Sequence, residues 1–208
     1  MSEYRLGVID YKAGNAPSVL NALTSRGIAA ELVSTAVQIE QMSALILPGV
    51  GSAGATMRSL EEIGCIQLLD DMVNKSGTPF LGICVGMQIL FEHSEEEDTQ
   101  CLSWIPGRVR RFSPDVRVPQ MGWNKADFRF GDPSLDGLGM SEYFYFVNSY
   151  YADPSDSGVI MATTDYRTEF CSMVKRGNIV ATQFHLEKSG EVGLKLLENF
   201  ARQGGAVC

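Results

Sequence analysis

The sequence predicts an α/β fold, an open and mostly parallel sheet with helices on both faces, and three observations predict it. In the first half of the chain, short apolar runs alternate with segments of helical periodicity, as in parallel strands joined by helices. In the second half, apolar runs are separated by turns of glycine, aspartate and proline, which favours antiparallel pairing and makes the sheet mixed. Between the two halves, a strand passes into a helix at a G-x-C-x-G pattern, residues 82–86.

The first half is expected to contain alternating strands and helices. Pro17 lies near the start of the first helix and Gly27 is a typical C-terminal stop, while Gly64 is a candidate break in the second helix. The expected strands are residues 5–11, 29–34, 43–49 and 79–84, and the expected helices are residues 16–27, 55–77 and 85–93.

The second half is expected to contain strands joined by turns and one closing helix. The acidic segment 92–100, which precedes these strands, is interpreted as a solvated loop with His93 exposed. In the closing helix, apolar residues recur at helical spacing. The expected strands are residues 105–112, 142–152, 158–165, 169–177 and 178–185, and the helix is residues 191–203.

Composition narrows the possible functions. The 208 residues suit one domain, residues 1–208, and the formal net charge of -8 makes a nucleic-acid partner unexpected, since the only basic cluster is residues 108–111. We expect neither a secretory signal nor a membrane span, and therefore a cytoplasmic location. An odd number of cysteines without a C-x-x-C pair indicates reduced thiols, and neither a metal nor another cofactor is expected.

The segment LPGVGSAG, residues 47–54, has the G-x-G-x-x-G spacing of a dinucleotide-binding turn. Such a site needs an acidic residue at the end of the next strand, where it binds a ribose hydroxyl. The acids at the right distance, Asp70 and Asp71, fall inside a predicted helix, and the next strand ends in Cys84. The dinucleotide interpretation is therefore disfavoured.

Cys84 is the candidate nucleophile. Gly82 and Gly86 flank it, as expected where a tight strand-to-helix turn leaves no room for a β-carbon. At the N-terminus of the following helix, the helix dipole favours the thiolate. The alternative is a buried cysteine that acts only as a small apolar residue.

A thiolate nucleophile needs a base, and the chain has two histidines. His93 lies in the acidic segment, whereas His185 ends a predicted strand and is followed at the second position by Glu187. Alternate residues of an extended segment point the same way, so Glu187 is expected to orient the His185 ring. Cys84, His185 and Glu187 would then form a triad.

A carbonyl attacked by Cys84 becomes an oxyanion that needs hydrogen-bond donors. The backbone N–H of Val85, directly after the nucleophile, is one candidate. The strand ending near residue 49 is expected to lie beside the strand that carries Cys84. The loop of Gly49, Val50 and Gly51 is therefore interpreted as an oxyanion loop.

These residues resemble the class I (triad) glutamine amidotransferases. The segments PGVG, GICVGMQ and FHLEKS carry this resemblance, and DYKAGN, PQMGWN and YFYFVNSYY make it closest to the glutaminase subunits of imidazole glycerol phosphate synthase. The similarity runs from about residue 5 to residue 200. It implies the class I amidotransferase fold as a single domain.

The resemblance also implies a reaction and a partner. Cys84 would attack the side-chain amide of L-glutamine, His185 would transfer the protons, and ammonia would pass to a (β/α)8 cyclase subunit in a heterodimer. The free glutaminase would be almost inactive until the partner's ligand flips the PGVG loop. The resemblance places Gln88, Ser149 and Tyr150 at the substrate, and Asn15, Trp123, Tyr145 and Lys188 at or near the partner.

Three residues depart from the pattern. Leu186 stands where the family usually has proline, and Gln120 and Asn148 stand where it usually has histidines. Proline would fix a backbone angle that leucine leaves free, and we expect the Leu186 side chain to point away from Cys84. These departures leave open a paralogue that supplies ammonia to another synthase, for example in surface-sugar biosynthesis, or a silent regulatory subunit. For Trp123, a core position is the alternative to an interface.

Overall fold

The computed structural model describes residues 4–12 and 15–203. The strands are β1 Leu6–Ile9, β2 Glu31–Val33, β3 Ala44–Gly49, β4 Phe80–Cys84, β5 His93–Ser94, β6 Thr99–Gln100, β7 Gly107–Arg111, β8 Gln120–Phe128, β9 Ser141–Asn148, β10 Tyr150–Pro154, β11 Ile160–Asp165, β12 Glu169–Arg176 and β13 Ile179–Thr182. The α-helices are α1 Ala16–Ser25, α2 Ala36–Glu40, α3 Ala53–Glu62, α4 Ile66–Asp70, α5 Val85–Gln88 and α6 Gly190–Gln203. Shorter turns are the π-helical η1 Asp71–Lys75 and the 3-10 turns η2 Glu96–Asp98, η3 Pro133–Leu135, η4 Ser157–Val159 and η5 Leu186–Lys188.

The strands form one mixed sheet, as the sequence predicts. Its path among the described residues runs β2-β1-β3-β4-β13-β12-β10-β7-β5-β6, with β11, β8 and β9 branching from β12. Pairing is parallel from β2 to β13 and becomes antiparallel from β12 onward, apart from the parallel pair β5 and β7.

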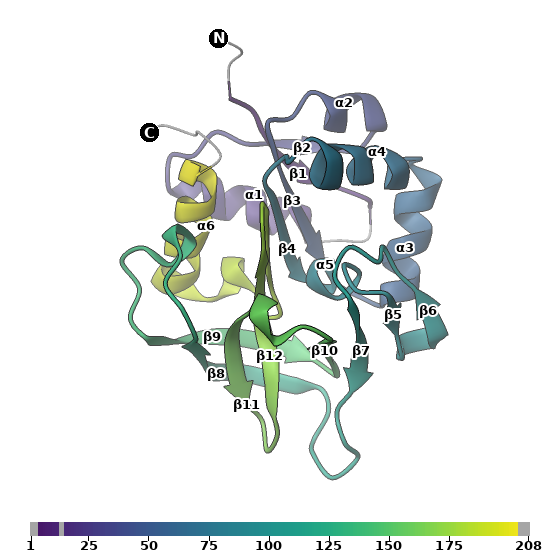
Figure 1. Ribbon diagram of the computed structural model, residues 1–208. Helices are drawn as coiled ribbons and strands as arrows, with labels where there is room; N and C mark the ends of the chain where they lie inside the picture. Colours follow the sequence, from purple (N-terminus) through teal and green to yellow (C-terminus); the bar gives the residue numbers. More distant parts are fainter. Residues whose placement is uncertain (1–3, 13–14, 204–208) are drawn as a thin grey trace.

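Helices cover both faces of the parallel strands (Figure 1). α1 and α6 lie on one side, and α3 and α4 lie on the other. Strands β1, β3, β4 and β13 are buried along their whole length, because helices exclude water from both faces. These near-continuous apolar runs are the pattern from which the parallel half was predicted.

The antiparallel half extends below the parallel strands in Figure 1, where β8 and β9 form a long ribbon. Its buried face carries Phe144 and Phe146, which pack on Phe184, the residue that follows β13 by two positions. The rings of Phe144 and Phe184 stack with centroids 3.9 Å apart. This aromatic packing holds the segment after β13 against β9.

Several boundaries differ from the predictions. The predicted helix 85–93 ends at Gln88. Leu90 and Phe91 donate i→i−3 hydrogen bonds, which tighten the turn, and the Leu90 carbonyl accepts from Ile105 N–H instead of from a helical partner. The predicted strand 142–152 is two strands, which separate at Ser149. β8 and α2 had no clear period in the sequence and were not predicted.

The predicted helix 55–77 is broken, as the sequence suggested. Gly64 adopts a positive φ of 66° between α3 and α4, a conformation that glycine reaches without strain. α3 begins two residues earlier than expected, at Ala53, where the Ser52 side chain accepts a hydrogen bond from Ala55 N–H. The end of the segment is π-helical rather than α-helical.

The interpretation of residues 92–100 as a solvated loop holds only in part: five of the nine residues are exposed, but the segment also makes structural contacts. Three of its carboxylates accept backbone hydrogen bonds, Glu92 from Gly107, Glu95 from Arg111 and Glu96 from Ala53. The segment contains β5, η2 and β6. Its carboxylates therefore hold neighbouring backbone in place as well as facing water. His93 is half-buried and contacts Asp98, whereas exposure was expected.

Candidate active site

Cys84 lies at the junction of β4 and α5, with φ 56° and ψ -111°. A positive φ is strained for a residue with a β-carbon, and such strain is typical of a nucleophile elbow. The flanking glycines are required sterically: a β-carbon at Gly82 would lie 2.5 Å from the Gly86 carbonyl oxygen, and one at Gly86 would lie 2.0 Å from the Leu47 carbonyl oxygen. The elbow predicted from G-x-C-x-G is present.

The end of β3 lies beside this elbow. Gly49 is in register with Cys84, and a β-carbon at Gly49 would lie 2.7 Å from the Gly86 nitrogen. The adjacency of the two strands was predicted, and it brings Val50 and Gly51 to the same pocket as Cys84 and Val85. Gly49 itself permits the close approach of the two strands and does not line the pocket.

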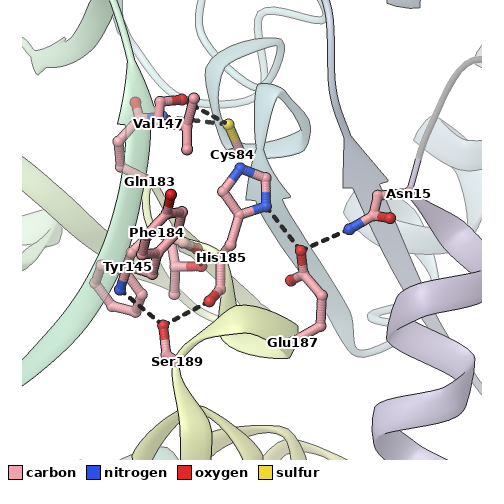
Figure 2. A network of polar contacts seen from close by, with 10 residues as sticks. Asn15, Cys84, Tyr145, Val147, Gln183, Phe184, His185, Glu187 and Ser189 are labelled. Carbon is pink, nitrogen blue, oxygen red and sulfur yellow. Dashed lines mark hydrogen bonds and ion pairs between the residues drawn. The ribbon is translucent and has the colours of Figure 1, made fainter. Parts of the chain in front are cut away.

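His185 follows β13 and is almost fully buried. Its backbone N–H donates to the Tyr145 carbonyl at 2.9 Å, so the β9 backbone positions it. Its Nδ1 lies 2.8 Å from Glu187 Oε1, and the other ring nitrogen faces Cys84 (Figure 2). Cys84, His185 and Glu187 therefore come together as predicted.

The expected reason for the His185–Glu187 contact was wrong. The segment after His185 is the 3-10 turn η5, not an extended strand. His185 precedes the turn, and the turn bends the chain so that the Glu187 carboxylate returns to the imidazole. Ser189 fixes the bend, because its hydroxyl donates to the His185 carbonyl and accepts from Tyr145 N–H.

The buried triad has shifted pKa values. Burial alone would lower the pKa of His185, but hydrogen bonds and charge interactions with Cys84 and Glu187 outweigh it and raise that pKa to about 10. Burial would raise the pKa of Glu187, but the imidazole and a hydrogen bond from Asn15 lower it. Asn15 Nδ2 donates to Glu187 Oε1 at 2.7 Å. This environment favours imidazolium beside carboxylate.

A cavity of about 230 Å³ opens above Cys84. It is lined by most of the residues that the sequence assigned to substrate and oxyanion contacts: Val50, Gly51, Val85, Gln88, Ser149 and Tyr150. Lys188, assigned to the partner, also lines it. These groups come from four separate segments, which only the folded sheet brings together.

Three groups at the site were missed by sequence reasoning. Glu96 lines the cavity, although the sequence placed it in a solvated loop. Gln183 Nε2 lies 3.7 Å from the Cys84 sulfur, and the Val147 carbonyl oxygen lies 3.9 Å from it (Figure 2). A carbonyl has no sequence signal, and a glutamine in an apolar strand has only its polarity.

Of the residues assigned to the partner, Lys188 lines the cavity, and Asn15 and Tyr145 bond to Glu187 and His185. Trp123 is 57% exposed, so a core position is excluded, and its ring meets Tyr145 edge-on. Met121 and Tyr143 are also exposed, at 66% and 59%. Large apolar side chains exposed together are typical of interaction surfaces.

The three departures from the family pattern are buried. Leu186 is inaccessible to solvent. Gln120 and Asn148 face each other across β8 and β9, and neither amide atom of Gln120 has a hydrogen-bond partner among the described residues. In residues 4–12 and 15–203, no cluster of three or more His, Cys, Asp or Glu side chains could hold a metal ion. No helix in those ranges is long and apolar enough to cross a membrane.

Comparisons with known proteins show the family and the fold of this chain. The family model described as glutamine amidotransferase class-I matches residues 7–203. A crystal structure of a glutamine amidotransferase superposes with a TM-score of 0.77 at 22% identity, covering 96% of this chain and 98% of its own. The PurLQS structure from Thermotoga maritima also gives a TM-score of 0.77, at 16% identity, covering 97% of this chain and 99% of its own. These two structures support the fold alone.

Two curated relatives are more similar in sequence. Imidazole glycerol phosphate synthase subunit HisH from Dehalococcoides mccartyi is 45% identical over 196 residues, 94% of this chain and 95% of the relative. The subunit of the same name from Methanothermobacter thermautotrophicus is also 45% identical over 196 residues, 94% of this chain and 96% of the relative. The chain therefore belongs to the class I glutamine amidotransferases and, within them, to the family of imidazole glycerol phosphate synthase subunit HisH.

Proposed function

We propose that this chain hydrolyses L-glutamine to glutamate and ammonia as the glutaminase subunit of imidazole glycerol phosphate synthase, in histidine biosynthesis. The ammonia is passed to a cyclase subunit with a (β/α)8 barrel, in a heterodimer, which makes imidazole glycerol phosphate and an aminoimidazole carboxamide ribotide. One observation carries the chemistry: Cys84 and His185 line one cavity, and Glu187 contacts the far side of the His185 ring. The similarity to HisH subunits carries the pathway.

In the first half-reaction, the Cys84 thiolate attacks the side-chain carbonyl carbon of glutamine. The carbon–sulfur bond forms as the carbonyl π electrons move to oxygen, giving a tetrahedral oxyanion. The oxyanion then collapses, the carbon–nitrogen bond breaks, and imidazolium His185 donates its proton to the leaving amine. Ammonia departs and a γ-glutamyl thioester remains on Cys84.

In the second half-reaction, neutral His185 accepts a proton from water as the water oxygen attacks the thioester carbon. The carbon–sulfur bond breaks, the Cys84 thiolate is regenerated beside imidazolium His185, and the new carboxyl group loses its proton to solvent as glutamate leaves. Glu187 holds Nδ1 at 2.8 Å throughout, which keeps the other ring nitrogen directed at the sulfur and stabilises imidazolium.

For the oxyanion, we propose the N–H groups of Val85 and of the Gly49–Gly51 loop as donors. Val85 follows the nucleophile and opens α5, where N–H groups lack helical partners. Val50 and Gly51 line the same cavity, and Gly51 has a φ of 95°, which glycine adopts readily. A flip of a peptide bond in the Gly49–Gly51 loop would turn an N–H toward the oxyanion and activate the site. Binding of the partner would control this flip.

For the substrate, Glu96 is the group best suited to the α-ammonium of glutamine, because it is the carboxylate in the cavity lining. Burial raises the pKa of Glu96, and a cation beside it would restore the charged form. The carbonyls of Ser149 and Tyr150 already accept hydrogen bonds from Phe112 and Gln88. This stretch would therefore offer N–H groups, which suit the α-carboxylate.

For the partner, we propose the exposed face of β8 and β9 that carries Met121, Trp123 and Tyr143. Trp123 lies close to Gly190, at the start of α6 and two residues beyond Lys188 of the cavity lining. A partner seated there would close the cavity from solvent. Asn15 and Tyr145 contact the triad residues directly, so they could transmit that contact to Glu187 and His185.

This function has two alternatives. A paralogous glutaminase would have the same triad and a different acceptor, so only the partner distinguishes it. A silent regulatory subunit is disfavoured, because the Cys84, His185 and Glu187 geometry is intact despite Leu186.

The test is glutamate release from glutamine by the purified chain, alone and with the cyclase subunit from the same genome plus its nucleotide ligand. We expect low activity alone and a rise of at least about a hundredfold with the liganded cyclase. The cyclase must be shown to use free ammonia. If it does and no rise occurs, the acceptor is a different synthase or the subunit is silent, and labelling of Cys84 by a glutamine-analogue alkylator separates these outcomes.

A further inference from the structure

We propose that Gln183 is a positioning residue for the nucleophile: its side-chain N–H holds the Cys84 sulfur as a hydrogen-bond acceptor and favours the thiolate. This rests on the proposed function only in taking Cys84 as the nucleophile. Gln183 is fully buried and lies immediately after β13, two residues before His185. One short segment thus supplies both the base and a donor to the sulfur.

The orientation of the Gln183 amide follows from a chain of hydrogen bonds. The Tyr150 carbonyl can only accept, so the Gln88 atom that lies 3.2 Å from it is Nε2. The same Gln88 Nε2 lies 3.0 Å from Gln183, which must therefore present Oε1 to it. Gln183 Nε2 is then left facing the Cys84 sulfur at 3.7 Å.

The surroundings prevent this amide from turning. The Gln183 backbone N–H donates to the Ser172 carbonyl at 2.9 Å, which fixes the chain after β13. Gln88 is 3% exposed, and its Nε2 already donates to both the Tyr150 carbonyl and Gln183 Oε1. Turning the Gln183 amide would place two N–H groups against each other in a buried site, which costs free energy.

Two groups act on the sulfur in opposite directions (Figure 2). The Val147 carbonyl, 3.9 Å away, can accept a hydrogen bond from the thiol but repels the thiolate. Gln183 Nε2 donates, and a donor stabilises an anion more than a neutral thiol. Gln183 therefore offsets the carbonyl and helps to retain the thiolate beside imidazolium His185.

The test is the pH profile of Cys84 alkylation by iodoacetamide in the isolated full-length chain. Mass spectrometry of the peptide that contains Cys84 separates it from the other cysteines. In Gln183→Leu, we expect the rate at pH 7 to fall about tenfold and the midpoint of the profile to rise by about one pH unit. Gln183→Glu should shift the midpoint further, because a carboxylate replaces the donor.

Gln120→Leu is the matched control, since Gln120 is also a buried glutamine but its amide makes no hydrogen bond to Cys84, His185 or any other described residue. Its profile should match the wild type. An unchanged midpoint in folded Gln183→Leu, within about 0.3 pH unit, overturns the proposal. Should Gln183→Leu not fold, Gln88→Met is the deciding variant, because it removes the donor that holds Oε1 of Gln183. A smaller upward shift of the alkylation midpoint then supports the proposal, and an unchanged midpoint refutes it. Alkylation requires neither glutamine nor the cyclase, so the glutaminase proposal can fail while this one holds.

Discussion

The two halves of the sheet position the reactive groups in different ways. In the parallel half, Cys84 is placed by its immediate neighbours, since Gly82, Gly86 and the elbow backbone are within two residues of it. His185 follows the last parallel strand, β13, but the antiparallel half holds it through distant contacts, chiefly the Tyr145 carbonyl from β9. The nucleophile is thus a local feature and the base is a tertiary one.

This difference determines which substitutions each half tolerates. Close backbone contacts around the elbow leave no space for an added methyl group, so changes there should disturb the fold. The side chains of His185 and Glu187 are oriented by side-chain hydrogen bonds such as Asn15 to Glu187, so changes to those side chains should disturb chemistry more than folding. The following predictions test this contrast.

The largest effect is expected from Cys84→Ala. Loss of the sulfur removes the nucleophile, so glutamate release in the presence of the liganded cyclase should fall to background. Alanine retains the β-carbon and fits the space, so partner binding and the cyclase reaction with free ammonia should remain. Retained glutamine turnover would refute the role of Cys84.

Gly86→Ala should instead break the elbow. Its β-carbon would lie 2.0 Å from the Leu47 carbonyl oxygen, and both groups belong to packed backbone that cannot move independently. We expect the free energy of unfolding in urea to fall by about 3 kcal/mol or more. Gly131→Ala is the control, because its β-carbon would have no neighbour within 4 Å. Equal stability of the two variants would contradict the steric account.

Glu187→Gln should impair the base while leaving the fold intact. Glutamine cannot stabilise imidazolium as a carboxylate does, so kcat should fall about a hundredfold or more and the pKa of His185 should drop from about 10. The measurement is kcat with the liganded cyclase across pH. A folded variant with unchanged kcat would contradict the assignment of Glu187.

The same pair predicts how stability depends on pH. Because folding raises the pKa of His185 from 6.5 to about 10, its contribution is complete below about pH 6.5 and is lost as pH rises through 10. Because folding lowers the pKa of Glu187 from 4.5, its contribution is present above about pH 4.5 and is lost in acid. The stability difference between wild type and Glu187→Gln should therefore be greatest between these values and shrink toward pH 10.

The contrast also explains how much the sequence could predict. The elbow, the adjacency of the Gly49 loop and the parallel strands all follow from local patterns, and they were predicted correctly. The His185–Glu187 contact was predicted for a wrong reason. A spacing of two residues is compatible with both an extended segment and a 3-10 turn, so the sequence alone does not distinguish them. Glu96, Gln183 and the Val147 carbonyl depend on long-range packing, and no residue pattern near them indicates it.

Glu96→Gln should affect substrate binding more than chemistry. Glutamine retains an oxygen for the Ala53 N–H but loses the charge proposed to bind the α-ammonium. We expect KM for glutamine to rise about tenfold with a smaller change in kcat. Glu97→Gln is the control, because Glu97 is exposed and pairs with Arg58 outside the cavity. Equal KM values for the two variants would exclude Glu96 from the substrate site.

The smallest effect is expected from Leu186→Pro. This substitution tests whether the backbone of η5 already aligns His185 and Glu187 for activity. His185 has φ -87° and ψ 108°, in the extended region that a residue before proline prefers, and position 186 is the first of the turn, where proline is well tolerated. The substitution removes a buried leucine, so stability should fall by about 1–2 kcal/mol. Glutaminase activity should stay within about tenfold, or ~1.4 kcal/mol in the activation barrier. A much larger gain in activity would mean that leucine leaves His185 and Glu187 poorly aligned, and that the turn, unlike the elbow, is not set by its own backbone.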